Sequence, residues 1–162
     1  MEAGANFFDH ADIYGNGACE EIFAEAVQMN PQPLVANQLQ LSITNTTMID
    51  SGINVNMEND AAVNRDGGIL DYCRLHDITI QPWSPFQYGF FEGVFLGSDK
   101  FPELNAKIDE IAAKYEVTNT TIAIAWLLRH PAHMQPVTGT TNIQRLQDCI
   151  KAGDVHLTRQ EC

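Results

Sequence analysis

The first 64 residues contain no lysine and no arginine, although they hold nine acidic side chains. The whole chain of 162 residues has a formal net charge of −12. Because such a surface repels phosphate groups, neither nucleic acid nor an anionic membrane is expected as a partner. The sequence also lacks the run of about 20 apolar residues that a membrane-spanning helix needs, and its start lacks the basic-then-apolar pattern of a secretory signal.

Cysteine is sparse, and its positions share no metal-ligand or disulfide-framework spacing. The four cysteines are Cys19, Cys73, Cys149 and Cys162. His130 and His133 have a metal-like spacing, but Pro131 lies between them and no third ligand is implied, so no metal site is expected. Scattered thiols are typical of a reducing compartment, and the sequence therefore predicts a cytoplasmic protein.

Apolar periodicity predicts alternating strands and helices over most of the chain. Helices are expected at 18–29, 66–75, 101–115, 120–129 and 142–152, and strands at 34–41, 78–83 and 135–137. The stretches 42–64 and 84–97 are expected to be loops, and residues 157–162 resemble the start of a capped helix. Alternation of this kind, with 44% apolar residues, indicates a parallel α/β fold with a hydrophobic core.

The stretch from Asn6 to Gly17 holds the densest group of reactive side chains. A short apolar run suited to a buried strand leads into Asp9, His10, Asp12 and Tyr14. Parallel α/β folds collect catalytic groups at this end of a strand. A tyrosine there can act as a general acid if a nearby cation lowers its pKa from about 10. The alternative is that the aspartates cap turns and the tyrosine packs.

These residues also carry a family resemblance. Phe-Asp-x-Ala-x-x-Tyr-Gly at 8–15, followed by Cys-Glu-Glu-Ile-Phe at 19–23, resembles the second-strand signature of the aldo-keto reductases. The resemblance implies a (β/α)8 fold of the TIM-barrel type. It also implies NADPH as cofactor and reduction of a small-molecule carbonyl substrate, an aldehyde or ketone. Within that family's Asp/Tyr/Lys/His tetrad, Tyr14 would donate the proton and Asp9 would support it.

Two later motifs resemble cofactor-binding strands of the same family. Val-Ala-Asn-Gln at 35–38 resembles the sixth strand, which implies that Gln38 binds the nicotinamide carboxamide. Gln-Pro-Trp-Ser-Pro-Phe at 81–86 resembles the seventh strand, which implies that Trp83 stacks on the nicotinamide and that Ser84 and Phe86 line the pyrophosphate. The alternatives are a solvent-facing glutamine and a tryptophan in the core.

A further motif, at 136–145, resembles the end of the family's eighth strand. It implies a site for the 2′-phosphate of NADPH, with Asp148 facing the adenine. The residues assigned to the phosphate are Gly139, Thr140, Thr141 and Arg145. Independently of the resemblance, a helix N-terminus offers N–H groups, threonine hydroxyls add donors, and arginine adds charge. The alternative is a capped helix with a solvated arginine.

The chain departs from the family pattern between the first two motifs. The tetrad lysine and histidine motifs of the third and fourth strands are missing, and the first lysine is Lys100. Strands two and six lie opposite each other in an eight-stranded barrel, whereas the four residues between Met29 and Leu34 span at most about 14 Å. We therefore predict a single partial domain over 1–162, about half a barrel, with a segment missing between about 29 and 34. The alternative is a true deletion variant, which would have to pack differently and would expose sheet edges.

Three functional hypotheses follow from these motifs. The first is an NADPH-dependent carbonyl reductase, in which the preference for NADPH over NADH depends on Arg145. The second is a catalytically inactive NADPH-binding remnant or regulatory subunit that lacks the tetrad lysine and histidine. The third is a structural fragment that folds only together with its missing half.

Overall fold

The computed structural model describes residues 15, 18–29, 35–50, 68–89 and 92–162. The chain divides into two compact units, Met1–Leu34 and Val35–Cys162. In the first unit the described element is helix α1 (Ala18–Met29), which confirms the predicted helix at 18–29. The second unit contains the other described elements and is considered by itself below.

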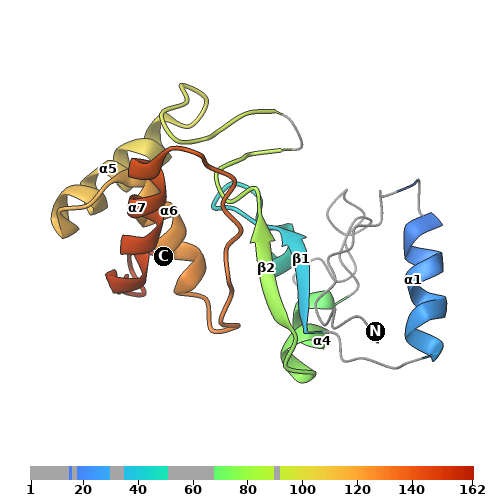
Figure 1. Cartoon of the computed structure of the whole chain (residues 1–162). Coiled ribbons are helices and arrows are strands. Elements are labelled where there is room, and N and C mark those ends of the chain that lie inside the picture. Colours follow the sequence, from blue (N-terminus) through green and yellow to red (C-terminus); the bar gives the residue numbers. More distant parts are fainter. Residues whose placement is uncertain (1–14, 16–17, 30–34, 51–67, 90–91) are drawn as a thin grey trace, which may run out of the picture. The chain divides into compact units, whose positions relative to one another are not determined.

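The second unit is built on two parallel strands, β1 (Ala36–Gln40) and β2 (Thr79–Trp83) (Figure 1). Their register pairs Ala36 with Thr79 and Gln40 with Trp83. Parallel strands need a crossover connection, and this one carries α2 (Thr47–Asp50) and α4 (Ile69–Leu75). Both strands were predicted, with ends that differ by one or two residues.

The connection between the strands differs from the prediction in two places. The short helix α2 lies within residues 42–64, which were expected to form a loop. Helix α4 begins at Ile69 because Gly68, at its N-cap, has a left-handed backbone with φ of 85° that a helix cannot continue. The helix was predicted from residue 66.

Residues 135–137 follow β2 without forming a regular strand, which corrects the third predicted strand. Gln135 N–H donates to the Ile80 carbonyl at 2.9 Å, and Val137 N–H donates to the Pro82 carbonyl at 2.8 Å. This spacing is that of a parallel pairing, and the segment runs beside β2 in Figure 1. The reciprocal bond would come from residue 82, and proline has no N–H. Pro82 therefore reduces a regular ladder to a one-sided contact.

Three helices follow the sheet: α5 (Pro102–Tyr115), α6 (Asn119–Leu128) and α7 (Ile143–Lys151), which leads into η3 (Ala152–Asp154). Their starts follow local rules, since Pro102 occupies the first turn of α5 and the side chains of Thr118 and Asn142 cap α6 and α7. Helix α6 packs against both α5 and α7. All three helices confirm the predictions to within one or two residues.

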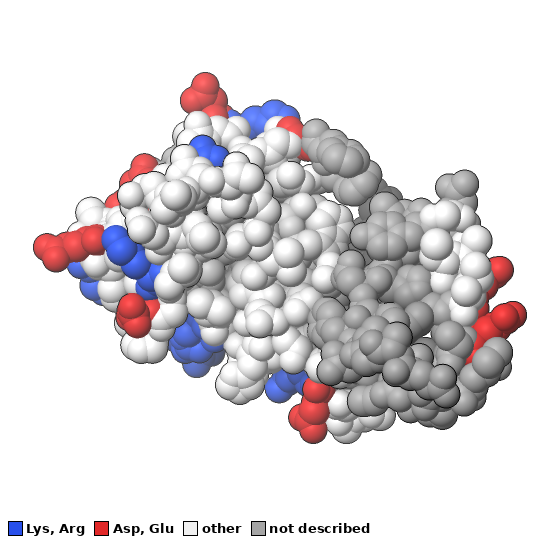
Figure 2. Space-filling view, viewed as in Figure 1, with Lys and Arg blue, Asp and Glu red and all other residues white. Residues whose placement is uncertain are grey.

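One cluster of buried apolar side chains extends from the strands and α4 to the C-terminal helices. Burying a Leu, Ile or Phe side chain in it stabilises the fold by about 1.5–3 kcal/mol. The cluster includes Leu41, Cys73, Ile80, Phe95, Ala123 and Leu127. Charged side chains of both signs are interspersed on the face shown in Figure 2. Among the helices of the described ranges, none has the length and apolar character needed to cross a bilayer.

Candidate functional site: the carboxyl ends of the strands

A row of three glutamine side chains crosses the sheet. Gln38 Nε2 donates to Gln81 Oε1 at 3.2 Å, and Gln81 Nε2 donates to Gln135 Oε1 at 2.8 Å. Gln38 and Gln81 are register partners, so their side chains leave the same face of the sheet. The neighbouring Asn37 points the other way, toward Cys73 of α4. The amide row therefore lies on the face opposite α4, and Gln38 is exposed there.

Beyond β2 the chain makes a tight turn that contains two predicted site residues. The Gln87 N–H donates to the Ser84 carbonyl at 3.0 Å, which closes the turn directly after Trp83. Ser84 has φ of 52°, a left-handed conformation that is uncommon for a residue with a side chain. Phe86 is half-buried, packs on the core, and accepts a backbone hydrogen bond from Phe95 at 3.0 Å. The predicted pyrophosphate loop is thus held in one defined shape.

The segment predicted to bind the 2′-phosphate precedes α7. Asn142 Oδ1 accepts from the Arg145 N–H at 3.2 Å, and Thr140 Oγ1 accepts from the Asn142 N–H at 3.2 Å. The side chains of Thr141 and Arg145 are exposed. Gly139 is also exposed, and a Cβ there would meet no atom within 4 Å, so folding alone does not require glycine at this position. The first turn of α7 and the Arg145 guanidinium therefore face solvent, where an anion can reach them.

Asp148 is less accessible than the rest of the predicted set. It is only 6% exposed, its Oδ1 accepts from Gln144 Nε2 at 3.3 Å, and its carbonyl accepts from the buried Thr121 hydroxyl at 2.9 Å. The contact with Thr121 joins α7 to α6, whereas the contact with Gln144 lies within α7. The contact between Asp148 and the adenine stays a prediction.

The three cofactor motifs leave the sheet in the same direction. β1 and β2 are parallel, and the two hydrogen bonds from Gln135 and Val137 to β2 advance in the same sense on both segments. Residues that follow β1, β2 and Val137 therefore emerge at one edge, the carboxyl end. Sequence motifs separated by about fifty residues are brought together by the parallel arrangement alone.

Two functional candidates at this edge were not singled out from the sequence. Gln40 lies two residues after Gln38, on the same face, and is the register partner of Trp83. Its Nε2 is buried and has no hydrogen-bond partner among the described residues. The two-residue alternation was a sufficient signal for Gln40. The second, Ser42, gave no such signal, because its role depends on a contact with a residue 45 positions away.

The donors at this edge suit a dinucleotide with an amide and phosphates. An orphaned buried N–H is costly unless an acceptor reaches it, and a carboxamide oxygen is such an acceptor. Trp83 offers a ring for stacking, and the α7 N-terminus with Arg145 offers charge-assisted donors to a phosphate. NADPH therefore fits the groups present.

The proposed acid–base pair is not among the described residues. Tyr14 and Asp9 both lie outside the described ranges, as do residues 30–34, where the missing segment was predicted. The roles of Tyr14 and Asp9, and the interruption near residue 30, stay predictions of the sequence.

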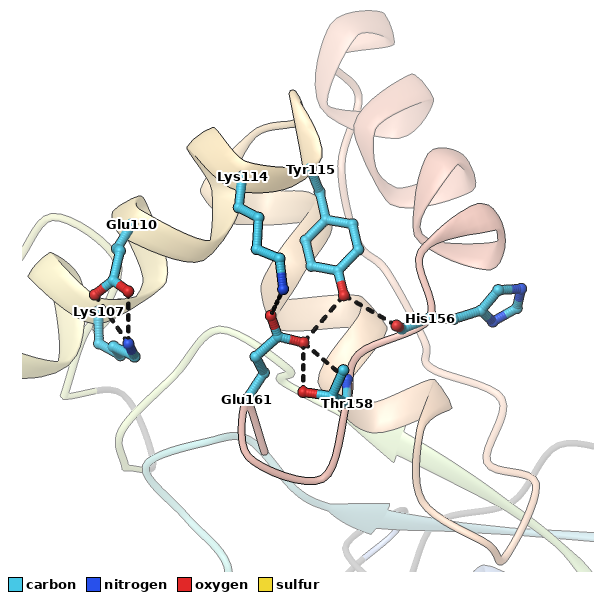
Figure 3. A network of polar contacts seen from close by, with 7 residues as sticks. All are labelled: Lys107, Glu110, Lys114, Tyr115, His156, Thr158 and Glu161. Carbon is cyan, nitrogen blue, oxygen red and sulfur yellow. Dashed lines mark hydrogen bonds and ion pairs between the residues drawn. The ribbon is translucent and has the colours of Figure 1, made fainter.

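The most strongly shifted ionisation lies elsewhere, in a network that joins α5 to the C-terminal segment (Figure 3). Hydrogen bonds from Lys114, from the Thr158 N–H and hydroxyl, and from Tyr115 lower the pKa of Glu161 from 4.5 to about 2. The Thr158–Glu161 contact is the glutamate half of the predicted capping box, at 2.8 Å. Glu161 accepts hydrogen bonds from three residues, and these contacts tie the C-terminal segment to α5, so the network has a structural role.

His130 makes a local contact next to Pro131. Its Nδ1 accepts from the Ala132 N–H at 3.2 Å, and burial together with the nearby Arg74 charge lowers its pKa. Within the described ranges, no cluster of His, Cys, Asp and Glu is placed to hold a metal ion.

Comparison with known proteins gives one family. The sequence profile of the Aldo/keto reductase family matches residues 33–162. The chain is 33% identical over 128 residues to a 6-dehydroglucose reductase of Agrobacterium fabrum, covering 78% of this chain and 36% of that protein. It is 28% identical over 111 residues to the aldo-keto reductase yakc [NADP(+)] of Schizosaccharomyces pombe, covering 56% of this chain and 33% of that protein. The chain thus spans about a third of the length of these relatives.

Solved structures agree on the fold. A thermostable aldo-keto reductase crystallised with the inhibitor epalrestat superposes with a TM-score of 0.53 at 21% identity, over 87% of this chain and 42% of that one. An aldo-keto reductase from a deep-sea metagenome library superposes with a TM-score of 0.51 at 17% identity, over 96% of this chain and 55% of that one. The family match begins at residue 33, after Asp9 and Tyr14. With four-fifths of its length inside the family profile, the chain belongs to the aldo/keto reductase family, whose fold is the (β/α)8 barrel.

Proposed function

We propose that this protein binds NADPH at the carboxyl edge of the sheet and takes part in reduction of a small-molecule aldehyde or ketone to an alcohol. Gln38 binds the nicotinamide carboxamide, Trp83 stacks on the ring, and Ser84 with Phe86 lines the pyrophosphate. The 2′-phosphate is held by the segment before α7, through Gly139, Thr140, Thr141 and Arg145. Asp148, at the base of the same helix, lies toward the adenine.

The observation that carries the proposal is the common direction of β1, β2 and residues 135–137. The three motifs lie on β1, across the end of β2 and from residue 136 onward, so a single extended ligand along this edge can contact all of them. Gln38 is on β1, and Arg145 follows the segment on the other side of β2. A dinucleotide has an uncharged ring at one end and a phosphate at the other, so it can contact both residues.

The chemical step belongs to residues that precede the family match. NADPH, when bound, supplies a hydride to the carbonyl carbon. Tyr14 donates a proton to the carbonyl oxygen, and Asp9 supports the tyrosine. Replacing Tyr14 by phenylalanine should therefore abolish carbonyl reduction but leave NADPH binding intact. Loss of NADPH binding instead would contradict a role as proton donor.

Titration of the 162-residue chain with NADPH, followed by nicotinamide fluorescence, tests the binding site. The variant Arg145→Ala should raise the NADPH dissociation constant at least about tenfold, because it removes a charge-assisted contact to the 2′-phosphate. Its NADH dissociation constant should not change. Arg159→Ala is the matched control, since Arg159 is an exposed arginine outside the motifs. Absence of saturable NADPH binding in the unaltered chain would overturn the proposal.

A second candidate is an NADPH-binding protein without turnover. It is favoured by the position of the first lysine, Lys100, which lies over the Tyr88 ring with Nζ 4.7 Å from the centroid. Lys100 thus has an aromatic partner in its own segment, and the tetrad lysine motif of the third strand is missing from the sequence. Saturable NADPH binding with no oxidation in the presence of small aldehydes would select this candidate. Measurable oxidation would exclude it.

A further inference from the structure

Ser42 has the contacts of a residue that shapes the cofactor site without touching the ligand. It is fully buried, with 0% of its surface exposed, and follows the end of β1. Its hydroxyl donates to the Gln87 carbonyl, beyond the end of β2, at 2.7 Å. A buried hydroxyl that donates across two elements constrains both of them, because breaking the bond would leave polar groups unsatisfied.

Ser42 joins two tight turns. After β1, the backbones of Ser42 and Asn45 exchange hydrogen bonds at 3.2 and 3.1 Å. After β2, the Gln87 N–H donates to the Ser84 carbonyl. The Ser42 hydroxyl connects the first turn to the second, and Thr44 supports it with a backbone N–H at 3.3 Å. Movement of one turn therefore requires movement of the other.

The second turn contains the strained residue of the site. Ser84 has φ of 52° although it carries a side chain, and this left-handed conformation is unfavourable for such a residue. It persists only where surrounding contacts hold it. Two hydroxyls from the segment after β1 reach this turn at the Gln87 carbonyl, Ser42 at 2.7 Å and Thr44 at the longer distance of 3.4 Å.

We propose that Ser42 is a positioning residue for dinucleotide binding, acting through the Ser84–Gln87 turn. Its hydrogen bond holds Ser84 in the left-handed conformation and so fixes the backbone that meets the pyrophosphate next to Trp83. This inference rests on the proposed NADPH site, and it assigns to that site a residue that makes no contact with the ligand.

Binding of two ligands separates this role from simple stability. Ser42→Ala should raise the NADPH dissociation constant about tenfold, yet leave that of adenosine 2′,5′-bisphosphate unchanged, because the bisphosphate lacks the pyrophosphate and nicotinamide. Tyr115→Phe, which removes a hydroxyl from the C-terminal network, is the matched control and should change neither. If Ser42→Ala weakens both ligands equally, or neither, Ser42 is not a positioning residue.

A double-mutant cycle tests the path through Ser84. Glycine adopts a left-handed conformation at no cost, so Ser84→Gly should no longer need the constraint from Ser42. In the Ser84→Gly background, Ser42→Ala should weaken NADPH binding only about twofold instead of tenfold. Additive effects of the two substitutions would show that Ser42 does not act through this turn.

A measurement without nucleotide separates this inference from the proposed function. Hydrogen exchange of the Gln87 amide, which closes the turn, should be at least about tenfold faster in Ser42→Ala and unchanged in Tyr115→Phe. If the unaltered chain fails to bind NADPH, the proposed function fails, while faster exchange still establishes Ser42 as the residue that holds the turn. Unchanged exchange overturns the inference whatever the NADPH result.

Discussion

The two faces of the β1–β2 pair carry side chains of different kinds, mainly apolar on one face and mainly polar on the other. On the face toward the helices, Ile80 is 1% exposed and Leu41 is fully buried. On the opposite face, Gln38 and Gln81 are joined by an amide hydrogen bond at 3.2 Å, and Gln38 is exposed. One set of alternating residues therefore supplies hydrophobic stabilisation, and the other supplies directional groups. Substitutions only one residue apart can therefore alter the stability of the fold and the binding of a ligand separately.

The largest expected effect comes from the apolar face. Replacing Ile80 by alanine should lower the free energy of unfolding by about 2–5 kcal/mol, because it removes buried methyl groups and leaves a cavity. The NADPH affinity of the molecules that remain folded should be unchanged. Urea unfolding followed by circular dichroism measures the change. Leu75→Ala, at a side chain 78% exposed, is the control and should cost less than about 0.5 kcal/mol.

An intermediate effect is expected on the amide face. Gln81→Ala removes the central amide of the row and should cost at most about 1 kcal/mol of stability. Its NADPH dissociation constant should rise about fivefold, because Gln38 loses a partner that orients it. Fluorescence titration measures this, with Gln160→Ala on the surface as control. A larger stability loss than that of Ile80→Ala would break the distinction between the two faces.

The polar network around Glu161, away from the sheet, differs from the amide row because its side chains stabilise the fold. The pKa of Glu161 is lowered to about 2, so its ionised form stabilises the fold above the ordinary value of 4.5. That contribution should be lost as the pH falls from about 4.5 through 2. Urea midpoints measured across this window should decrease more steeply for the unaltered chain than for Glu161→Gln. Equal slopes would show that the network contributes nothing.

The smallest effect is expected from an ion pair on the surface of α5. Lys107 Nζ lies 2.8 Å from Glu110 Oε1, yet the two side chains are 56% and 68% exposed. Solvent screens such pairs, so Lys107→Ala should change the free energy of unfolding by less than about 0.5 kcal/mol. The same urea assay tests this, and a loss above about 1 kcal/mol would mean that exposure does not determine which polar contacts stabilise this protein.

Local sequence patterns predicted most of the described helices and strands, but they did not predict the contacts between these elements. Apolar periodicity identified the helices, and the N-cap at Asn142 marked the start of α7, whereas the cap that Thr118 provides for α6 was not predicted. Alternation identified β1 and β2, but not the register that pairs Gln38 with Gln81. The prediction of a third regular strand was wrong because it considered residues 135–137 alone. A regular strand is prevented there by Pro82 of the neighbouring strand β2, which has no N–H to donate.

At the candidate site, the sequence located the segments better than the interactions inside them. Gln38, Trp83 and Thr140 belong to segments that leave the sheet together, as the parallel fold implies. Ser42 lay outside every motif, because its importance comes from a hydrogen bond that folding creates. Asp148 followed the motif at helical spacing, yet the packing of α7 on α6 buries its carboxylate. Burial and long-range pairing are properties of the folded molecule.

Pro82 in β2 determines which contact between segments of this protein should break first under mechanical tension. Because residue 82 has no N–H, β2 contributes only carbonyl acceptors to the backbone hydrogen bonds with residues 135–137. Between β1 and β2, by contrast, backbone N–H groups of both strands donate. Under mechanical tension or gradual denaturation, the contact between β2 and residues 135–137 should break first. The C-terminal helices should then separate together, while β1 and β2 stay paired.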